Sequence, residues 1–354
     1  MDLVTQGILG GAIGQAGFQN KLGKKAVLWG SIIGLIPDLD ILVKVSNHPL
    51  SEQLYHRGFT HSLFFAPLLA PFLAGLLCRL YDKKLQVPTY WTWFWLAFWV
   101  LITHPLLDLF TTYGTQLLNP ISNYRFSLSG IAIIDPLYSV PLLVAVLMGL
   151  WNKTQPFRAY LTSSVLLLTT TYLFYGVSCN QKAISLARQS IGHQGSIMIN
   201  SYPTLLQIHV RRLVAHVGNQ VWIAYTTTYP GSNYPIHWEK YDKAPPELCE
   251  SFLATPEAKI YNWFCDGDFI MIHEQGMLRM QDLRFGFIGS SQLGIWGLQA
   301  KINLDGSLQT SPQKFRHATN YIKSSNDIAM TKIIQLFQAS SGQESQLLGI
   351  RHPR

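Results

Sequence analysis

The first half of the chain is dominated by apolar segments that are almost free of charged residues. Residues 1–179 contain 11 Lys and Arg and 7 Asp and Glu, whereas residues 180–354 contain 16 and 12. The charged fraction of the whole chain is 13%, about half of the ~25% that is typical of globular proteins. We therefore expect a multi-pass α-helical membrane domain over residues 1–179. A linker over residues 180–199 and a smaller α+β soluble domain, mainly antiparallel sheet, over residues 200–354 complete the predicted organisation.

Five apolar segments approach the length of about 20 residues that a helix needs to cross the hydrocarbon core of a bilayer. They cover residues 26–45, 62–77, 90–110, 136–151 and 157–177, and the first is broken at Pro37-Asp38-Leu39-Asp40. Residues 3–18 are apolar and rich in glycine, which predicts either a further short span or a re-entrant helix. We expect no cleavable signal peptide, because Met1-Asp2 lacks the basic start that such a peptide carries.

The loops between these segments differ in their content of basic residues. One set of loops contains Lys21, Lys24, Lys25, Arg79, Lys83, Lys84, Lys153 and Arg158, and the other contains Lys44, Arg57 and Arg125. Because basic loops of membrane proteins face the cytoplasm, we place the first set there. The second set and the soluble domain are then expected on the outer side.

Acids and histidines gather at the ends of the apolar segments that this orientation places on the outer side. They are Asp38, Asp40, His56, His61, His104, Asp108 and Asp135. An ionisable group at membrane depth costs free energy, so it is by default a hypothesis of function. Three His and four Asp exceed the three protein ligands of a usual catalytic zinc site. We therefore expect one or two divalent ions, preferably Zn, with Mn or Fe also suited to these ligands.

The most regular pair in this group is His104 and Asp108, which are four residues apart. A helix places both on one face, and Pro105 removes a backbone donor from the turn that carries them. The alternative interpretation is a kinked membrane helix in which the two side chains only bond each other.

His56 and His61 flank a short polar segment that also contains Arg57 and Thr60. We expect Thr60 to cap the following helix and to fix His61 at its positive end. The imidazoles suit a transition metal, and Arg57 suits a phosphate or carboxylate. A polar interfacial loop with a snorkelling arginine is the alternative.

Asp38 and Asp40 are two residues apart and do not share a helical face, so Pro37 predicts a break where both can turn inward. One can bind a metal while the other bridges a second ion or orients a histidine. Asp135 precedes Pro136 and fits either a helix cap or a ligand. We assign metal binding to Asp38, His56, His61, His104, Asp108 and Asp135, and catalytic roles to Arg57 and Asp40.

Several of these motifs together resemble the YdjM-like family of membrane-bound metal-dependent hydrolases. They run in order through the first 150 or so residues: the opening Met1-Asp2-Leu3-Val4-Thr5-Gln6, Pro37-Asp38-Leu39-Asp40, His56 to Ser62, Thr103 to Asp108, Tyr113-Gly114-Thr115-Gln116 and Ile134 to Tyr138. The resemblance implies a hydrolase of the bacterial inner membrane. Many members carry histidine near position 6, where this chain has Gln6, so we assign no ligand to the first helix.

The second half predicts a different kind of structure. Residues 207–217 and 220–228 flank Gly218-Asn219, which indicates a hairpin. Residues 269–273 and 278–283 predict a second hairpin, residues 294–302 a further strand and residues 327–339 a helix. The histidines of this half have no metal-like mutual spacing, so we interpret them as strand or surface residues. Cys249 and Cys265 are expected to form a disulfide if the domain lies outside the cytoplasm.

Three classes of function are compatible with these features. We favour a hydrolase that acts on a phosphoester or lipid-like substrate at the outer face, with a metal-activated water as nucleophile. A transporter or ion pathway would use the same groups as a relay, but no matching polar groups occur at the cytoplasmic ends. A scaffold with a structural metal is the third class. The expected partner is a membrane lipid or amphiphile and not a nucleic acid, because the basic residues are scattered among acids.

Overall fold

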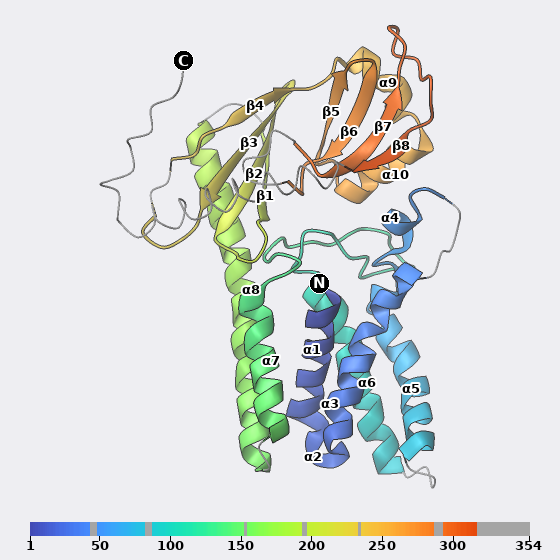
Figure 1. Ribbon diagram of the computed structural model, residues 1–354, viewed down its shortest axis with the longest axis vertical. Helices are drawn as coiled ribbons and strands as arrows, with labels where there is room; N and C mark the ends of the chain where they lie inside the picture. The colour runs from blue at the N-terminus through green and yellow to red at the C-terminus, as the bar shows by residue number, and fades with distance from the viewer. Residues whose placement is uncertain are drawn as a thin grey trace. The chain divides into compact units, whose positions relative to one another are not determined.

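The fold is described from a computed structural model of the chain, which covers residues 1–42, 48–81, 87–151, 154–192, 197–232, 235–286 and 293–316. The chain divides into two compact units. The first contains Met1–Val177 together with Leu205–Gln207, and the second contains Ser178–Thr204 and the residues from Ile208 onward. The first unit is helical and the second contains two antiparallel sheets (Figure 1). A helical first half followed by a mainly antiparallel second half is therefore confirmed.

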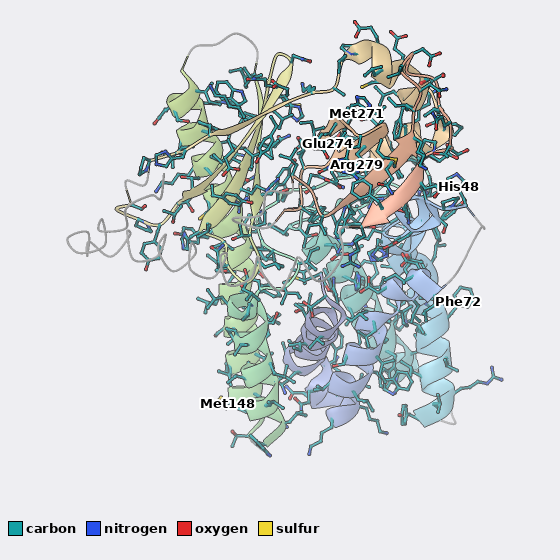
Figure 2. All side chains as sticks on the ribbon, turned by 45° about the horizontal axis from the view of Figure 1, so that its top comes forward. His48, Phe72, Met148, Met271, Glu274 and Arg279 are labelled. Atoms are coloured by element: carbon teal, nitrogen blue, oxygen red, sulfur yellow. The ribbon has the colours of Figure 1, made fainter. Side chains whose placement is uncertain are left out.

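The helical unit consists of α-helices joined by short 3-10 and π-helical turns. These elements are α1 (Leu3–Ile13), a π-helical turn (Gly14–Phe18), α2 (Gln19–Leu22), α3 (Lys24–Leu35), a 3-10 helix (Pro37–Leu42), α4 (Ser51–Tyr55), a second 3-10 helix (Phe59–His61), α5 (Phe65–Tyr81), α6 (Val87–Asp108), α7 (Pro136–Trp151) and the first part of α8 (Gln155–Ile191). Large apolar side chains such as Phe72 of α5 and Met148 of α7 point away from the bundle (Figure 2).

Glycines hold α1 against α3. A Cβ atom at Gly10 would lie 2.1 Å from the carbonyl oxygen of Gly30, and one at Gly14 would lie 2.1 Å from that of Ala26. The two helix backbones therefore touch, and only glycine fits at these positions. The sequence indicated a short span or a re-entrant helix for residues 3–18; the structure has α1 and a π-helical turn in direct contact with α3.

One helix in the described part of the chain, Pro156–Ile191, is long and apolar enough to cross a membrane. Ser51–His61 and Phe65–Tyr81 meet the same criterion only when taken together, and they are bent by 66°. Helix α7 is apolar but shorter. The multi-pass arrangement therefore stays a prediction from the sequence.

Helix α8 corrects the expected linker over residues 180–199. The helix continues to Ile191, and β1 starts at Met198. The physical reason is a stripe of small and apolar residues at helical spacing, Ala183, Ala187 and Ile191, which is buried in a core of the second unit.

The second unit contains two four-stranded sheets, ordered β1-β2-β3-β4 and β5-β6-β7-β8, with all neighbours antiparallel. The strands are β1 (Met198–Pro203), β2 (Val210–Val217), β3 (Gln220–Thr227), β4 (Glu239–Asp242), β5 (Phe269–Glu274), β6 (Met277–Asp282), β7 (Trp296–Lys301) and β8 (Gln313–Arg316), with α9 (Pro246–Leu253) and α10 (Pro256–Cys265) between the sheets in sequence. Both expected hairpins are confirmed, with Val217 opposite Gln220 and Glu274 opposite Met277. The expected helix over residues 327–339 lies outside the described residues.

The expected disulfide between Cys249 and Cys265 is wrong. Both thiols are free and buried. Each lies on its own helix. Cys249 Sγ is 3.9 Å from the carbonyl oxygen of Ala244, just before α9, and Cys265 Sγ is 3.6 Å from that of Asn262 in α10. Burial raises the pKa of the Cys265 thiol, which keeps it protonated and unreactive.

Candidate metal centre

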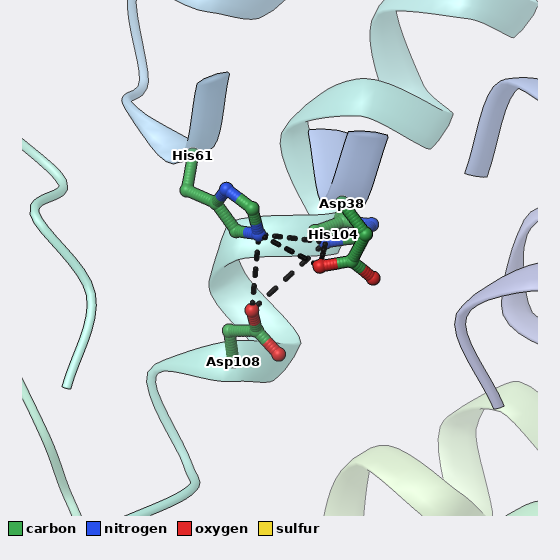
Figure 3. Close-up of side chains that lie close together, drawn as sticks. All are labelled: Asp38, His61, His104 and Asp108. Carbon is green, nitrogen blue, oxygen red and sulfur yellow. Dashed lines mark hydrogen bonds and ion pairs between the residues drawn. The ribbon is translucent and has the colours of Figure 1, made fainter. Parts of the chain in front are cut away.

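Four side chains from three parts of the helical unit meet in one buried cluster (Figure 3). Asp38 comes from the 3-10 helix after α3, His61 from the 3-10 helix before α5, and His104 and Asp108 from the last turns of α6. One ligand atom from each residue lies within 4.8 Å of the others. The structure thus brings together four of the six residues that the sequence assigned to a metal.

The spacing of these atoms fits a single ion. His61 Nε2 lies 3.1 Å from His104 Nε2, 3.2 Å from Asp38 Oδ1 and 3.4 Å from Asp108 Oδ2. In a tetrahedral zinc site with bonds of about 2.0–2.1 Å, neighbouring ligand atoms are roughly 3.3 Å apart. His104 Nε2 is 3.6 Å from Asp38 Oδ1 and 3.9 Å from Asp108 Oδ2, so the cluster is slightly wider on that side.

The protonation of His104 is fixed by its other ring nitrogen. His104 Nδ1 lies 2.7 Å from the carbonyl oxygen of Gly34, and a carbonyl can only accept a hydrogen bond. Nδ1 therefore carries the proton of the neutral imidazole, and Nε2 presents a lone pair to the cluster. The buried backbone of α3 at Gly34 thereby orients a residue of α6.

His61 is fixed in the same way by Asp40 and Thr60. Thr60 Oγ1 donates to Asp40 Oδ2 at 2.8 Å, so its oxygen accepts from His61 Nδ1 at 3.0 Å. Asp40 Oδ2 also lies 3.3 Å from His61 Nδ1. A carboxylate on the far nitrogen of a metal-binding histidine is a common arrangement. Thr60 therefore has this role and not the helix cap that we expected.

Two imidazole lone pairs thus face each other at 3.1 Å beside two carboxylates. Such an arrangement of acceptors is unfavourable unless a cation lies among them. Asp38 Oδ2 is also buried and accepts no hydrogen bond from the described residues. The residues present therefore fit a divalent metal ion.

Asp40 and His56 lie beside this cluster and not in it. The Asp40 carboxylate accepts from His56 Nδ1 at 2.8 Å, from the backbone N–H of Arg57 at 3.1 Å and from Thr60. With these donors and His61 Nδ1 around it, Asp40 has little remaining capacity for a metal. His56, expected as a ligand, instead donates to Asp40. The expected catalytic role of Asp40 becomes one of holding His61.

Arg57 provides a buried positive charge next to the cluster. Its Nε lies 3.1 Å from Asp108 Oδ2, and its Nη1 donates to Thr111 Oγ1 at 2.8 Å. Its backbone has φ of +59°, which is unusual for a residue with a side chain. The guanidinium groups of Arg57 and Arg125 both lie over the ring of Tyr113, at 4.9 and 5.1 Å. Tyr113 belongs to a motif that the sequence highlighted without assigning it a role.

Asp135 has a structural position outside the cluster. Its carboxylate accepts from the backbone N–H of Leu137 at 3.0 Å at the start of α7, and from the hydroxyl of Tyr172 at 2.9 Å. It is therefore a helix cap, one of the two roles that the sequence left open, and the assignment as a metal ligand is corrected.

Gln6 was not assigned to the site, yet it contacts it. Its Nε2 donates to Asp108 Oδ1 at 3.1 Å and to the carbonyl oxygen of His104 at 3.3 Å. The amino group of Met1 also pairs with Asp108 Oδ1. The only signal in the sequence was position 6 itself, where the family resemblance led us to expect a histidine.

The fold and the site together define a class of protein. Its members have a helical domain with a buried His and Asp cluster, followed by a domain of two antiparallel sheets. The chain belongs to the YdjM inner membrane protein family, whose model matches residues 1–181. The family expected from the motifs is thereby confirmed, and the match contains every residue of the cluster.

Two relatives show how far the similarity reaches. The chain is 30% identical over 110 residues to the uncharacterized protein YfhP of Bacillus subtilis (strain 168), which covers 31% of this chain and 32% of that protein. It is 36% identical over 107 residues to the inner membrane protein YbcI of Escherichia coli (strain K12), which covers 27% of this chain and 54% of YbcI. The matched part thus spans about a third and about half of these relatives. No solved structure matches the chain significantly.

Proposed function

We propose that this protein is a membrane-embedded, metal-dependent hydrolase of phosphoester or lipid-like substrates. The observation that carries the proposal is the cluster of Asp38, His61, His104 and Asp108, in which two imidazole lone pairs converge with two carboxylates. These residues would hold one divalent ion. Zinc is the preferred metal because a compact set of His and Asp ligands suits tetrahedral coordination, and Mn or Fe is also compatible with these ligands.

A divalent ion held by these residues would supply Lewis acidity toward a phosphoryl oxygen and toward water. The protein's own contribution is to orient the ligands and to add positive charge. Asp40 and Gly34 keep the Nε2 atoms of the two histidines unprotonated. Arg57, 3.1 Å from Asp108, is placed to neutralise a phosphate oxygen, because a guanidinium matches phosphate geometry. The proposal uses a single ion, since Asp40 is occupied by hydrogen-bond donors.

The proposed location is the bacterial inner membrane, with the helical unit as a multi-pass domain and the second unit on the outer side. Membership of an inner membrane protein family supports the compartment. The distribution of basic loops supports the orientation. The substrates proposed for this face are membrane lipids or amphiphiles, which agrees with the exposed apolar side chains near the cluster residues in sequence, Leu39, Phe59 and Leu106.

The test is an assay of the purified protein with a phospholipid and with a water-soluble phosphodiester. We expect metal-dependent hydrolysis by the wild type, loss of hydrolysis in Asp108→Asn and full activity in Asp135→Asn, which is the same chemical change at a helix cap. Metal-loaded wild type without turnover of either substrate would count against a hydrolase and favour a structural metal. Ion flux into vesicles that is lost in Asp108→Asn would favour transport.

A further inference from the structure

An apolar groove lies on the helical unit close to the candidate metal centre. It has a volume of about 340 Å³ and is bounded by α1, α3 and α7. Figure 1 shows α1 between the other two helices. Its lining includes Leu3, Gly7 and Ile8 of α1, Leu35 of α3, and Leu143 and Val146 of α7. This volume falls at the lower end of the roughly 300–1,000 Å³ that is typical of small-molecule sites.

The absence of a side chain at Gly7 helps to keep the groove open. A Cβ atom at Gly7 would be in ordinary contact with Leu35 Cδ2, at 3.5 Å, so a larger side chain at this position would extend into the groove. The neighbouring glycines have a different role. A Cβ atom at Gly10 would clash with the Gly30 carbonyl, which fixes the distance between α1 and α3.

The lining selects a hydrocarbon ligand. Among the described residues that line it none is charged, and the hydroxyl of Ser31 is the single side-chain polar group. The rim is open to the surroundings, since Leu3 is 53% and Val4 is 70% exposed. In a protein of an inner membrane family, such an opening favours an acyl chain, because it offers almost no partners to a polar ligand.

Two residues that line the groove, Gly7 and Leu35, are adjacent in sequence to residues that contact the metal centre. Gly7 follows Gln6, whose side chain donates to Asp108. Leu35 follows Gly34, whose carbonyl accepts from His104. Two lining residues are therefore direct neighbours in sequence of residues that contact the cluster.

We propose that this groove binds an acyl chain of the substrate while the phosphoester end of the same molecule reaches the metal centre. The inference rests on the proposed hydrolase function and makes it more specific, because it names a long-chain phospholipid as the substrate class. A soluble phosphate ester has no acyl chain to occupy the groove.

The test is photo-crosslinking in vesicles of phosphatidylethanolamine and phosphatidylglycerol that contain a phosphatidylglycerol with a diazirine in one acyl chain. Labelled peptides are mapped by mass spectrometry for the full-length wild type, Gly7→Leu, Leu143→Trp and Gly75→Leu. The last is the matched control, because a Cβ atom at Gly75 meets nothing within 4 Å. Leu143→Trp fills the groove from α7, where the native side chain is 39% exposed, and so does not depend on how α1 tolerates a leucine.

We expect the peptides with residues 3–8 and 143–146 to be labelled more strongly than the lipid-facing surface around Phe72. Both groove variants should lower that labelling about tenfold, and Gly75→Leu should leave it unchanged. Labelling equal to that around Phe72, or labelling that neither groove variant lowers, would overturn the proposal. The labelling does not require turnover. Groove-specific labelling of a protein without hydrolase activity would therefore contradict the proposed hydrolase function but support a groove that binds lipid.

Discussion

The proton positions of two histidines carry most of the argument for a metal. The Gly34 carbonyl keeps the proton of His104 on Nδ1, and Asp40 and Thr60 do the same for His61. In both rings the nitrogen that faces the cluster is therefore an acceptor. The same residues without these partners could rearrange their protons and satisfy each other, and the cluster would then need no ion.

Asp40→Asn tests the role of the carboxylate behind His61. An asparagine can present an NH₂ group to His61 Nδ1 and so disturb the orientation of the ring. We expect metal affinity to fall roughly 10- to 100-fold, as is usual when such a supporting group is removed. The measurement is competition with a chelator of known affinity. Asp135→Asn is the control, and equal affinities of the two variants would contradict a special role for Asp40.

Arg57→Gln tests whether the positive charge of Arg57 is needed for turnover but not for metal binding. The guanidinium contacts Asp108 but is not a metal ligand, so we expect the bound metal to be retained. Loss of one preorganised donor in a buried site lowers turnover by about 10²–10³. Steady-state hydrolysis together with metal content checks this prediction. A variant that keeps wild-type turnover would remove Arg57 from the mechanism.

Residue types and spacing were enough to predict the cluster. They did not distinguish the metal ligands from nearby residues of the same type that have structural roles. His104 and Asp108 follow from helical periodicity, and His61 and Asp38 from short polar breaks in apolar sequence. His56 and Asp135 have the same chemistry as the ligands, yet one donates to Asp40 and the other caps α7. The partner of His56 comes from another segment of the chain, so the local pattern does not reveal it. The cap at Asp135 is local, but the same pattern is equally compatible with a metal ligand.

At the scale of elements, the contact between α1 and α3 positions the site. It places Gln6 and Gly34 side by side: a Cβ atom at Gly34 would lie 2.7 Å from the carbonyl oxygen of Gln6. Both residues contact side chains of the cluster. A larger distance between α1 and α3 would therefore displace Gln6 and Gly34 and weaken their contacts with the cluster.

Gly30→Ala tests this coupling. The new methyl group would lie 2.2 Å from the Gly10 carbonyl oxygen, which forces the helices apart. Overpacking of this kind costs about 1–3 kcal/mol, so we expect a lower thermal midpoint and weaker metal binding. Gly75→Ala adds the same methyl group in open space and should change neither. Unchanged stability of Gly30→Ala would show that α1 and α3 are not held as described.

Secondary structure elements with a clear hydrophobic period could be predicted from the sequence. Very short elements, and elements in which buried residues lie among polar ones, could not. The hairpins β2–β3 and β5–β6 follow from alternating runs around a turn, with Gly218 and Gly276 at positive φ. Strands β4 and β8 are four residues each, too short for a clear period. The end of α8 extends through the segment that we expected as a linker, because Ala183, Ala187 and Ile191 at helical spacing pack in a core of the second unit.

At the scale of the whole molecule, the orientation in the membrane is the main prediction from the sequence that stays open. It depends on loop charges, and several of the basic residues involved, such as Lys83 and Lys84, lie outside the described residues. We expect alkaline phosphatase fused after the C-terminus to be active in a bacterial host, and green fluorescent protein at the same point to be dark. The reverse pattern would place the second unit in the cytoplasm.

The metal content of the purified full-length protein tests the central claim most directly. Elemental analysis should find about one divalent ion per chain in the wild type and in Asp135→Asn, since one set of ligands serves one ion. His61→Ala, His104→Ala and Asp108→Asn should each lose most of it while remaining folded by circular dichroism. A wild type that binds no divalent metal when purified or after metal addition, or three variants that all retain it, would contradict the account.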